Sequence, residues 1–217
     1  MSDSNNKDSD KSTIVKPDEQ QGLDIQGYIK IFDPDSGAVY VDKKNAIHYE
    51  NFSKSLANSV ANRATGFIEE MHFGNGGTSV DNTGIITYLT PNTTGANANL
   101  YNRTYYKSVN DNSSLNTDTT RNKITIAHTD GTTYTDTIIS CLLDFGEPSG
   151  QSAFDNTTTV NDTYVFDEIA LFSWEGTAGS GNLLTHVIFH PVQKSLNRLI
   201  QIDYTIRIQS LTNFVDV

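Results

Sequence analysis

Apolar and polar residues alternate along much of the chain, and this alternation predicts β-strands. The clearest case lies near the C-terminal end, where every second position from 200 to 208 is apolar and the positions between carry Gln, Asp, Thr or Arg. Successive side chains of a strand point to opposite faces, so one face of this segment is expected to be buried and the other solvated. We therefore predict a half-buried antiparallel strand over residues 200–208.

A hairpin is predicted near the start of the chain. Leu23, Ile25, Ile29 and Ile31 share one face at period two, the turn sequence DPDSG follows, and residues 38–41 (AVYV) return as a strand. The D-x-D-x-G in this turn is similar to part of a calcium loop, but it lacks the later ligands and the closing Glu of an EF-hand. Asp, Pro, Ser and Gly are the usual turn residues, so we interpret the segment as a turn.

From residue 84 onward the sequence also favours strands and turns. Asp130–Gly131 is a favourable turn pair and predicts a hairpin, and residues 163–174 (TYVFDEIALFSW) predict a strand. Residues 183–190 (LLTHVIFH) also predict an extended segment, which we expect to end at Pro191. Residues 91–121 are rich in Asn, Thr and Ser and are expected to form a long loop excursion.

One helix is predicted, over residues 50–64. Phe52, Leu56, Val60 and Ala64 recur every four residues and form a single apolar stripe. Asn51 or Ser53 is the expected N-cap. A helix with one apolar stripe is expected to pack against a sheet.

These elements predict a mainly β protein. We expect an antiparallel β-sandwich or jelly-roll-like core with one packed helix, formed by a single domain over residues 22–217. Residues 1–21 are rich in Ser, Asp, Asn and Lys and poor in apolar side chains. We expect them to form an extended polar arm that contacts a neighbouring subunit, so that deleting them weakens assembly and leaves the fold intact.

Charge and composition argue against several classes of partner. The net charge is -11 and no cluster of Lys or Arg occurs, which argues against direct binding to nucleic acid or to an anionic membrane. No apolar run reaches the roughly 18 residues of a membrane span, and the N-terminal residues lack the apolar core of a secretion signal. We therefore expect synthesis in the cytoplasm. The single cysteine, Cys141, lies in an apolar strand and is expected to be buried and inert.

Two histidines, His186 and His190, are four residues apart, the spacing at which a helix can present two zinc ligands. Their segment is predicted to be extended, and on a strand residues four apart are separated by about 13 Å. One ion cannot bridge that distance. We therefore expect no metal site there and interpret both histidines as semi-buried or interface residues.

No other arrangement predicts a catalytic or cofactor site. The glycine stretch FGNGG (residues 73–77) lacks the Gly-Lys-Ser/Thr ending of a phosphate-binding loop and is expected to be a wide turn or a close backbone approach. Asp144 and Glu147 could be read as a carboxylate pair of a glycosidase, as could Asp167 and Glu168. The latter two are adjacent on a predicted strand and are expected to point to opposite faces. We expect no enzyme activity, no cofactor and no metal.

Three stretches carry a resemblance to a known class of protein. YVFDEIALFSWEGTAGSGNLLTHVIF resembles a strand, acidic residue, Ile-Ala-Leu-Phe and glycine-turn pattern of structural proteins from tailed bacteriophages. PVQKSLNRLIQIDYTIRI is similar to their closing segment, and GYIKIFDPDSGAVYVDKKNAIHYENFSKSLA is similar to their opening hairpin and helix. Together these stretches cover about half of the chain. Proteins of this class belong to the neck, tail and fibre-attachment regions, and no catalytic residues carry over.

The resemblance implies a non-enzymatic virion protein that assembles in several copies at the neck or tail. Its expected partners are other virion proteins and copies of itself, contacted through the arm and the long loop. A capsid decoration protein is one alternative. A carbohydrate-binding module of a fibre is another, in which a glycan stacks on exposed aromatic rings. The candidate interface residues are Tyr101, Tyr105, Tyr106, Trp174, His186 and His190.

Overall fold

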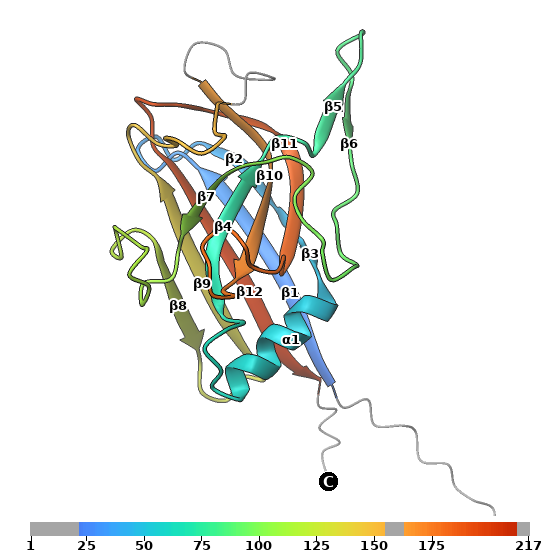
Figure 1. Ribbon diagram of the computed structural model, residues 1–217, viewed down its shortest axis with the longest axis vertical. Helices are drawn as coiled ribbons and strands as arrows, with labels where there is room; N and C mark the ends of the chain where they lie inside the picture. Colours follow the sequence, from blue (N-terminus) through green and yellow to red (C-terminus); the bar gives the residue numbers. More distant parts are fainter. Residues whose placement is uncertain (1–21, 155–162, 212–217) are drawn as a thin grey trace, which may run out of the picture.

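Two five-stranded antiparallel sheets pack on each other in the computed structural model, which describes residues 22–154 and 163–211 (Figure 1). The first sheet has the order β2 (Val39–Lys44), β1 (Gly22–Phe32), β12 (Ile200–Leu211), β9 (Tyr134–Leu143) and β8 (Lys123–His128). The second has the order β3 (Ala46–Ile47), β11 (Thr185–Ser195), β10 (Thr163–Ser173), β4 (Ile68–Gly74) and β7 (Arg103–Ser108). A separate two-stranded sheet is formed by β5 (Thr78–Val80) and β6 (Ile86–Tyr88).

Over residues 22–154 and 163–211, the predicted mainly β fold with one helix is confirmed. The hairpins β1–β2, β8–β9 and β10–β11 each remain within one sheet, so the architecture is a sandwich. The predicted arm over residues 1–21 lies outside the described residues.

The core lies between the two sheets and follows the alternation in the sequence. In β12 the predicted inward positions Ile202, Tyr204 and Ile206 are buried, and the residues between them are partly exposed. β12 pairs with both β1 and β9, so the strand with the most regular alternation is central to its sheet. Cys141 is also buried in this core, where desolvation raises the pKa of its thiol to about 12, as expected for an inert cysteine.

The helix α1 (Tyr49–Val60) is shorter than predicted. Asn62, just beyond its end, has a positive φ of 51°, and Val60, its last residue, is 82% exposed. Phe52 is buried as predicted, but Ser55 joins it on the buried face, and the stripe does not extend to Ala64.

The predicted N-cap of this helix was wrong. His48 is the cap, because its Nδ1 accepts a hydrogen bond from the backbone N–H of Asn51 at 3.2 Å. Asn51 lies inside the first turn, where its side-chain amide donates to the carbonyl of Leu183. Ser53 also lies within the helix, and its hydroxyl donates to the carbonyl of Glu50.

Two further predictions about strands differ from the structure. The tyrosine-rich centre of the predicted 91–121 loop is strand β7, which pairs with β4 at an edge of the second sheet. The predicted end at Pro191 was also wrong, because β11 continues through this proline to Ser195. The register between β10 and β11 shifts between Phe166 and Glu168, next to Pro191, and such an irregularity can accommodate a proline.

Candidate functional site

The second sheet buries a row of ionisable side chains on the face that looks away from the main core. Ile169 and Leu171 of β10 point into the main core, whereas Ala170 and Phe172 form a second apolar cluster with Leu100 and Leu183. By alternation, Glu168 lies on the same face as Ala170 and Phe172. This outer face carries two buried Glu–His pairs, Glu168–His186 and Glu70–His72.

The Glu168 carboxylate is the anchor of the segments that cover this face. It is fully buried, and it accepts hydrogen bonds from the backbone N–H groups of Gly76 at 3.2 Å, Tyr101 at 3.0 Å and Asn102 at 2.9 Å. His186 Nε2 lies 3.0 Å from the same carboxylate. One side chain therefore fixes both ends of residues 76–102. This segment is called the 76–102 excursion and differs from the predicted loop over residues 91–121.

His186 extends this anchor to the middle of the excursion. Its Nδ1 accepts a hydrogen bond of 2.8 Å from the backbone N–H of Asn92, so Nε2 carries the proton that is donated to Glu168. A neutral imidazole satisfies both contacts. Because both ring nitrogens are occupied within the protein, this arrangement holds a loop in place.

The glycine stretch of residues 73–77 forms a loop, called the glycine loop, to which Glu168 binds through Gly76. The adjacent residue Asp167 binds the same loop, contrary to the prediction that Asp167 and Glu168 point to opposite faces. Its carboxylate accepts from the N–H groups of Gly77 and Thr78, both at 2.9 Å, and from the Thr78 hydroxyl. The register shift between Phe166 and Glu168 interrupts the regular alternation at this point. Burial raises the pKa of Asp167, whereas hydrogen bonds from His186 and from backbone N–H groups outweigh burial and lower the pKa of Glu168.

The glycine loop is a close backbone approach, as the sequence predicted. A Cβ atom on Gly77 would lie 2.9 Å from the Ile188 side chain, and one on Gly76 would lie 2.7 Å from the backbone nitrogen of Asn102. Residues with side chains would not fit without displacing these neighbours. The glycines thus let backbone N–H groups reach the two carboxylates.

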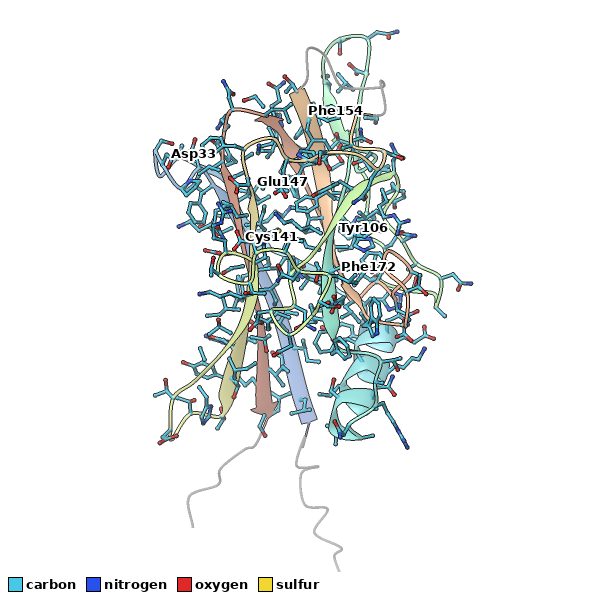
Figure 2. The ribbon with its side chains drawn as sticks, turned by 60° about the vertical axis from the view of Figure 1, so that its left-hand side comes forward. Asp33, Tyr106, Cys141, Glu147, Phe154 and Phe172 are labelled. Atoms are coloured by element: carbon cyan, nitrogen blue, oxygen red, sulfur yellow. The ribbon has the colours of Figure 1, made fainter. Side chains whose placement is uncertain are left out.

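The second pair, Glu70–His72, holds the turn after β10 in the same way. Glu70 accepts from the backbone N–H of Gly179 at 2.9 Å and 3.0 Å, and its Oε2 lies 2.8 Å from His72 Nε2. The His72 ring stacks on Phe172 at a centroid distance of 3.8 Å and lies 5.3 Å from Tyr106; Figure 2 labels these two aromatic neighbours. Burial lowers the pKa of His72, so its neutral form is favoured.

The Asp167 and Glu168 anchors lie at the base of a hairpin that extends beyond the sandwich. The projecting hairpin (residues 78–89) contains β5, a turn and β6, and Figure 1 shows it reaching past the end of the two main sheets. Val80 and Ile85 are each 62% exposed, and Tyr88 and Leu89 are exposed beside them. The backbone N–H of Leu89 donates to Gly77, which ties the end of the hairpin to the glycine loop.

The turn of the projecting hairpin is also held by specific contacts. Asp81 Oδ1 accepts from the Thr83 hydroxyl at 2.7 Å and from the backbone N–H groups of Ile85 at 3.0 Å and Thr83 at 2.8 Å, and these bonds lower the pKa of Asp81. The hydroxyl of Tyr88 lies 3.3 Å from His190 Nδ1 on β11. The exposed apolar side chains are therefore presented on a fixed scaffold.

The predicted interface residues are dispersed in the structure. Tyr101 is 45% exposed near the projecting hairpin, where its hydroxyl donates to the Thr90 carbonyl, and His190 is exposed on β11. Tyr105 and His186 are buried within the chain, so their side chains are not exposed on its surface. Tyr105 is buried because it lies on strand β7, which was not predicted. His186 is buried beside Glu168, to which it is hydrogen-bonded.

The remaining two aromatic side chains are half-buried in separate places. Tyr106 packs between His72 and the guanidinium of Arg103, whereas Trp174 lines a groove beside α1. The four aromatic residues therefore do not form one platform on which a glycan could stack.

A cluster of cations and carboxylates occupies the site of the other predicted acid pair. Asp144 pairs with Arg121, and Glu147 pairs with Lys107 at 2.5 Å (Glu147 is labelled in Figure 2). The two carboxylates thus have separate cationic partners. Lys194 lies between their backbone carbonyls and donates to both.

Among residues 22–154 and 163–211, no group of three or more His, Cys, Asp or Glu side chains is arranged to hold a metal ion. In the same described part of the chain, the helix is too short and too polar to cross a membrane. No protein-family model, curated protein or solved structure matches the chain.

Proposed function

We propose that the protein is a non-enzymatic structural protein of a tailed-phage virion, assembled in several copies at the neck or tail. The observation that carries this proposal is the projecting hairpin, which combines exposed apolar side chains with a rigidly anchored base. Exposed apolar patches on soluble proteins mark protein–protein contacts. Val80, Ile85, Tyr88 and Leu89 are the exposed apolar side chains along this hairpin.

The anchors below the hairpin are suited to assembly. Glu168 and Asp167 hold its base through backbone N–H groups, and Asp81 holds its turn. A contact surface that is ordered before binding loses less conformational entropy when the partner arrives. The ionisable groups that could suggest catalysis are thus used to position an interaction surface.

The phage assignment is supported by the place of the resembling segment. FDEIALFS forms most of β10, and the Asp and Glu of this segment are the residues that anchor the glycine loop and the excursion. Glu168, the acidic residue of the resembling pattern, is therefore one of the residues that anchor the candidate interaction surface. The exposed hairpin then provides a contact for a neighbouring virion protein.

Antibody-gold labelling of intact particles from the encoding phage tests the location. Label at the neck or tail supports the proposal, and label over the head favours the capsid decoration alternative. No label on any particle, with the protein expressed and its epitope accessible, would count against a virion role.

Replacing the apolar side chains of the projecting hairpin is expected to block incorporation into particles. The double variant Val80→Ser, Ile85→Ser removes two exposed apolar side chains, so the free energy of unfolding should change by less than about 1 kcal/mol. Its content in purified particles should fall about tenfold or more, because apolar anchors dominate interface energies. Quantitative immunoblotting of particles assembled with plasmid-supplied protein measures this content.

Val39→Ser is the matched control, because Val39 is also exposed and apolar but lies on β2. It should enter particles as the wild type does. Wild-type incorporation of the hairpin variant would refute the proposed role of the hairpin.

A further inference from the structure

The sheet edges of this protein are protected unequally. Strand β7 lies at one edge of the second sheet, where the side chain of Gln151 covers it. The backbone N–H of Tyr106 donates to Gln151 Oε1 at 2.9 Å, and Gln151 Nε2 donates to the Tyr106 carbonyl at 3.0 Å. The backbone N–H of Ser152 also donates to the Thr104 carbonyl. The Tyr106 N–H and C=O and the Thr104 C=O are thus paired at this edge.

Strand β8, at the edge of the first sheet, is protected at only one end. The backbone N–H of Ile124 points away from β9 and donates to Asp111 Oδ1 at 3.0 Å. In an antiparallel pair, outward-pointing residues alternate with residues that bond the neighbouring strand. Ile126 and His128 therefore also direct their N–H and C=O groups outward. Within the described part of the chain, no bond from outside the sheet reaches the Ile126 backbone.

An apolar groove adjoins this unprotected edge. It has a volume of about 810 Å³ and lies between α1, the start of β4 and the end of the first sheet. Ile126 lines the groove and is 64% exposed. The other large apolar side chains of the lining are Phe52, Leu56, Phe67, Ile68, Ile124, Trp174 and Ile208. Unpaired backbone groups and an exposed isoleucine thus occur together.

We propose that β8 pairs antiparallel with β8 of a second copy of this chain, with Ile126 opposite its own equivalent. The two copies would then share one continuous ten-stranded sheet, formed from the two five-stranded sheets. Ile126 of each copy would exchange two backbone hydrogen bonds with the other, as opposed residues of a hydrogen-bonded pair do. The two exposed side chains would cover each other at the groove face.

Charge along the strand favours this antiparallel self-pairing. Lys123 lies at the start of β8, and the turn that follows its end contains Asp130. Antiparallel pairing centred on Ile126 places residue 123 opposite residue 129, so Lys123 of one copy approaches Asp130 of the other. The contact is therefore self-complementary at both ends, as a two-fold interface requires.

The short edge predicts a weak dimer. Asp111 already occupies the N–H of Ile124, which this register places opposite His128 of the other copy. Only the central Ile126–Ile126 pair is therefore free to form both of its hydrogen bonds. Interfaces below about 1,200 Å² are typical of transient complexes. We therefore expect association that rises with protein concentration. This inference does not depend on the virion role, because it concerns the purified chain alone.

Sedimentation velocity of the purified full chain over a range of concentrations tests the proposal. The wild type should shift from monomer to dimer, and Ile126→Lys should weaken the association constant about tenfold or more, because lysine on an edge strand opposes strand pairing. Thr125→Lys is the matched control. It adds the same charge to an exposed neighbour whose backbone bonds β9 and whose side chain points to the other face. This variant should dimerise like the wild type.

Hydrogen exchange locates the contact independently. Exchange of the Ile126 and His128 amides should slow as the wild-type concentration rises, and exchange in the Ile126→Lys protein should not. Circular dichroism checks that each variant folds, and Ile126→Thr replaces the lysine variant if that protein does not fold. A wild type that stays monomeric at every concentration overturns the proposal. Equal association constants for Ile126→Lys and Thr125→Lys would also overturn it. So would a slowing of amide exchange that is confined to residues outside β8.

Discussion

Replacing Glu168 with alanine is expected to destabilise the fold by about 3–5 kcal/mol, the cost of removing one partner from a buried charged network. The change leaves the partly buried N–H groups of Gly76, Tyr101 and Asn102 without their acceptor, and it leaves the buried His186 Nε2 without its partner. Each unsatisfied buried group costs about 1–3 kcal/mol. Chemical denaturation monitored by fluorescence measures the loss.

Asp42→Ala is the control for this experiment, because it also removes a carboxylate, but from an exposed residue of β2. It should change the free energy of unfolding by less than about 0.5 kcal/mol. If Glu168→Ala costs no more than this control, the carboxylate does not anchor the excursion. Proteolysis within residues 76–102 should also be faster in the Glu168 variant, because both ends of that excursion are released.

The Glu168 contribution should depend on pH with a defined sign. Burial alone raises its pKa, but the hydrogen bonds from His186, Asn102 and Tyr101 outweigh this effect, so the folded-state pKa lies below the usual 4.5. In acid the unfolded chain therefore binds the proton first. The stabilisation is complete above about pH 5 and is lost as the pH falls through the folded-state pKa.

Glu168→Gln isolates this titration, because the amide keeps the shape of the side chain and cannot ionise. The difference in unfolding free energy between wild type and variant should shrink as the pH falls below about 5. A constant difference across this range would show that the ionised form of Glu168 is not the stabilising one.

The sequence predicted the strands whose apolar alternation is regular and whose partners follow nearby. Strand β12 alternates over its length, and the β8–β9 hairpin turns at the expected pair Asp130–Gly131, where Gly131 has a positive φ of 85°. Strand β7 was missed because it contains Arg103 and Lys107 and because its partner β4 lies far away in the sequence. Periodicity within one segment cannot identify a partner of that kind.

The candidate site was missed for a related reason. Alternation predicted opposite faces for Asp167 and Glu168, but the register shift with β11 depends on the partner strand and is not visible in β10 alone. One signal was available, because two acids interrupt the otherwise apolar run VFDEIALF. Buried carboxylates require hydrogen-bond donors, and the nearby glycine stretch supplies backbone N–H groups that can approach closely.

Replacing Lys194 with methionine is expected to destabilise the fold by about 3 kcal/mol, the effect of leaving buried carbonyls without donors. The Lys194 side chain is fully buried, and its Nζ donates to the carbonyls of Asp144 at 2.9 Å, Glu147 at 2.7 Å and Ser195 at 3.0 Å. Methionine fills a similar volume and donates no hydrogen bond. Burial lowers the pKa of Lys194 to about 8, so the amine still carries all three donors at neutral pH. Denaturant unfolding at neutral pH measures the cost.

Lys43→Met provides the comparison, because Lys43 is exposed and its Nζ donates to a single carbonyl, that of Ile188 at 2.8 Å. Water can replace that donor, so this variant should lose less than about 1 kcal/mol. Equal losses in the two variants would mean that burial and the number of carbonyls do not determine the cost. A large loss only at Lys194 would show that this one amine joins the 144–147 turn to the end of β11.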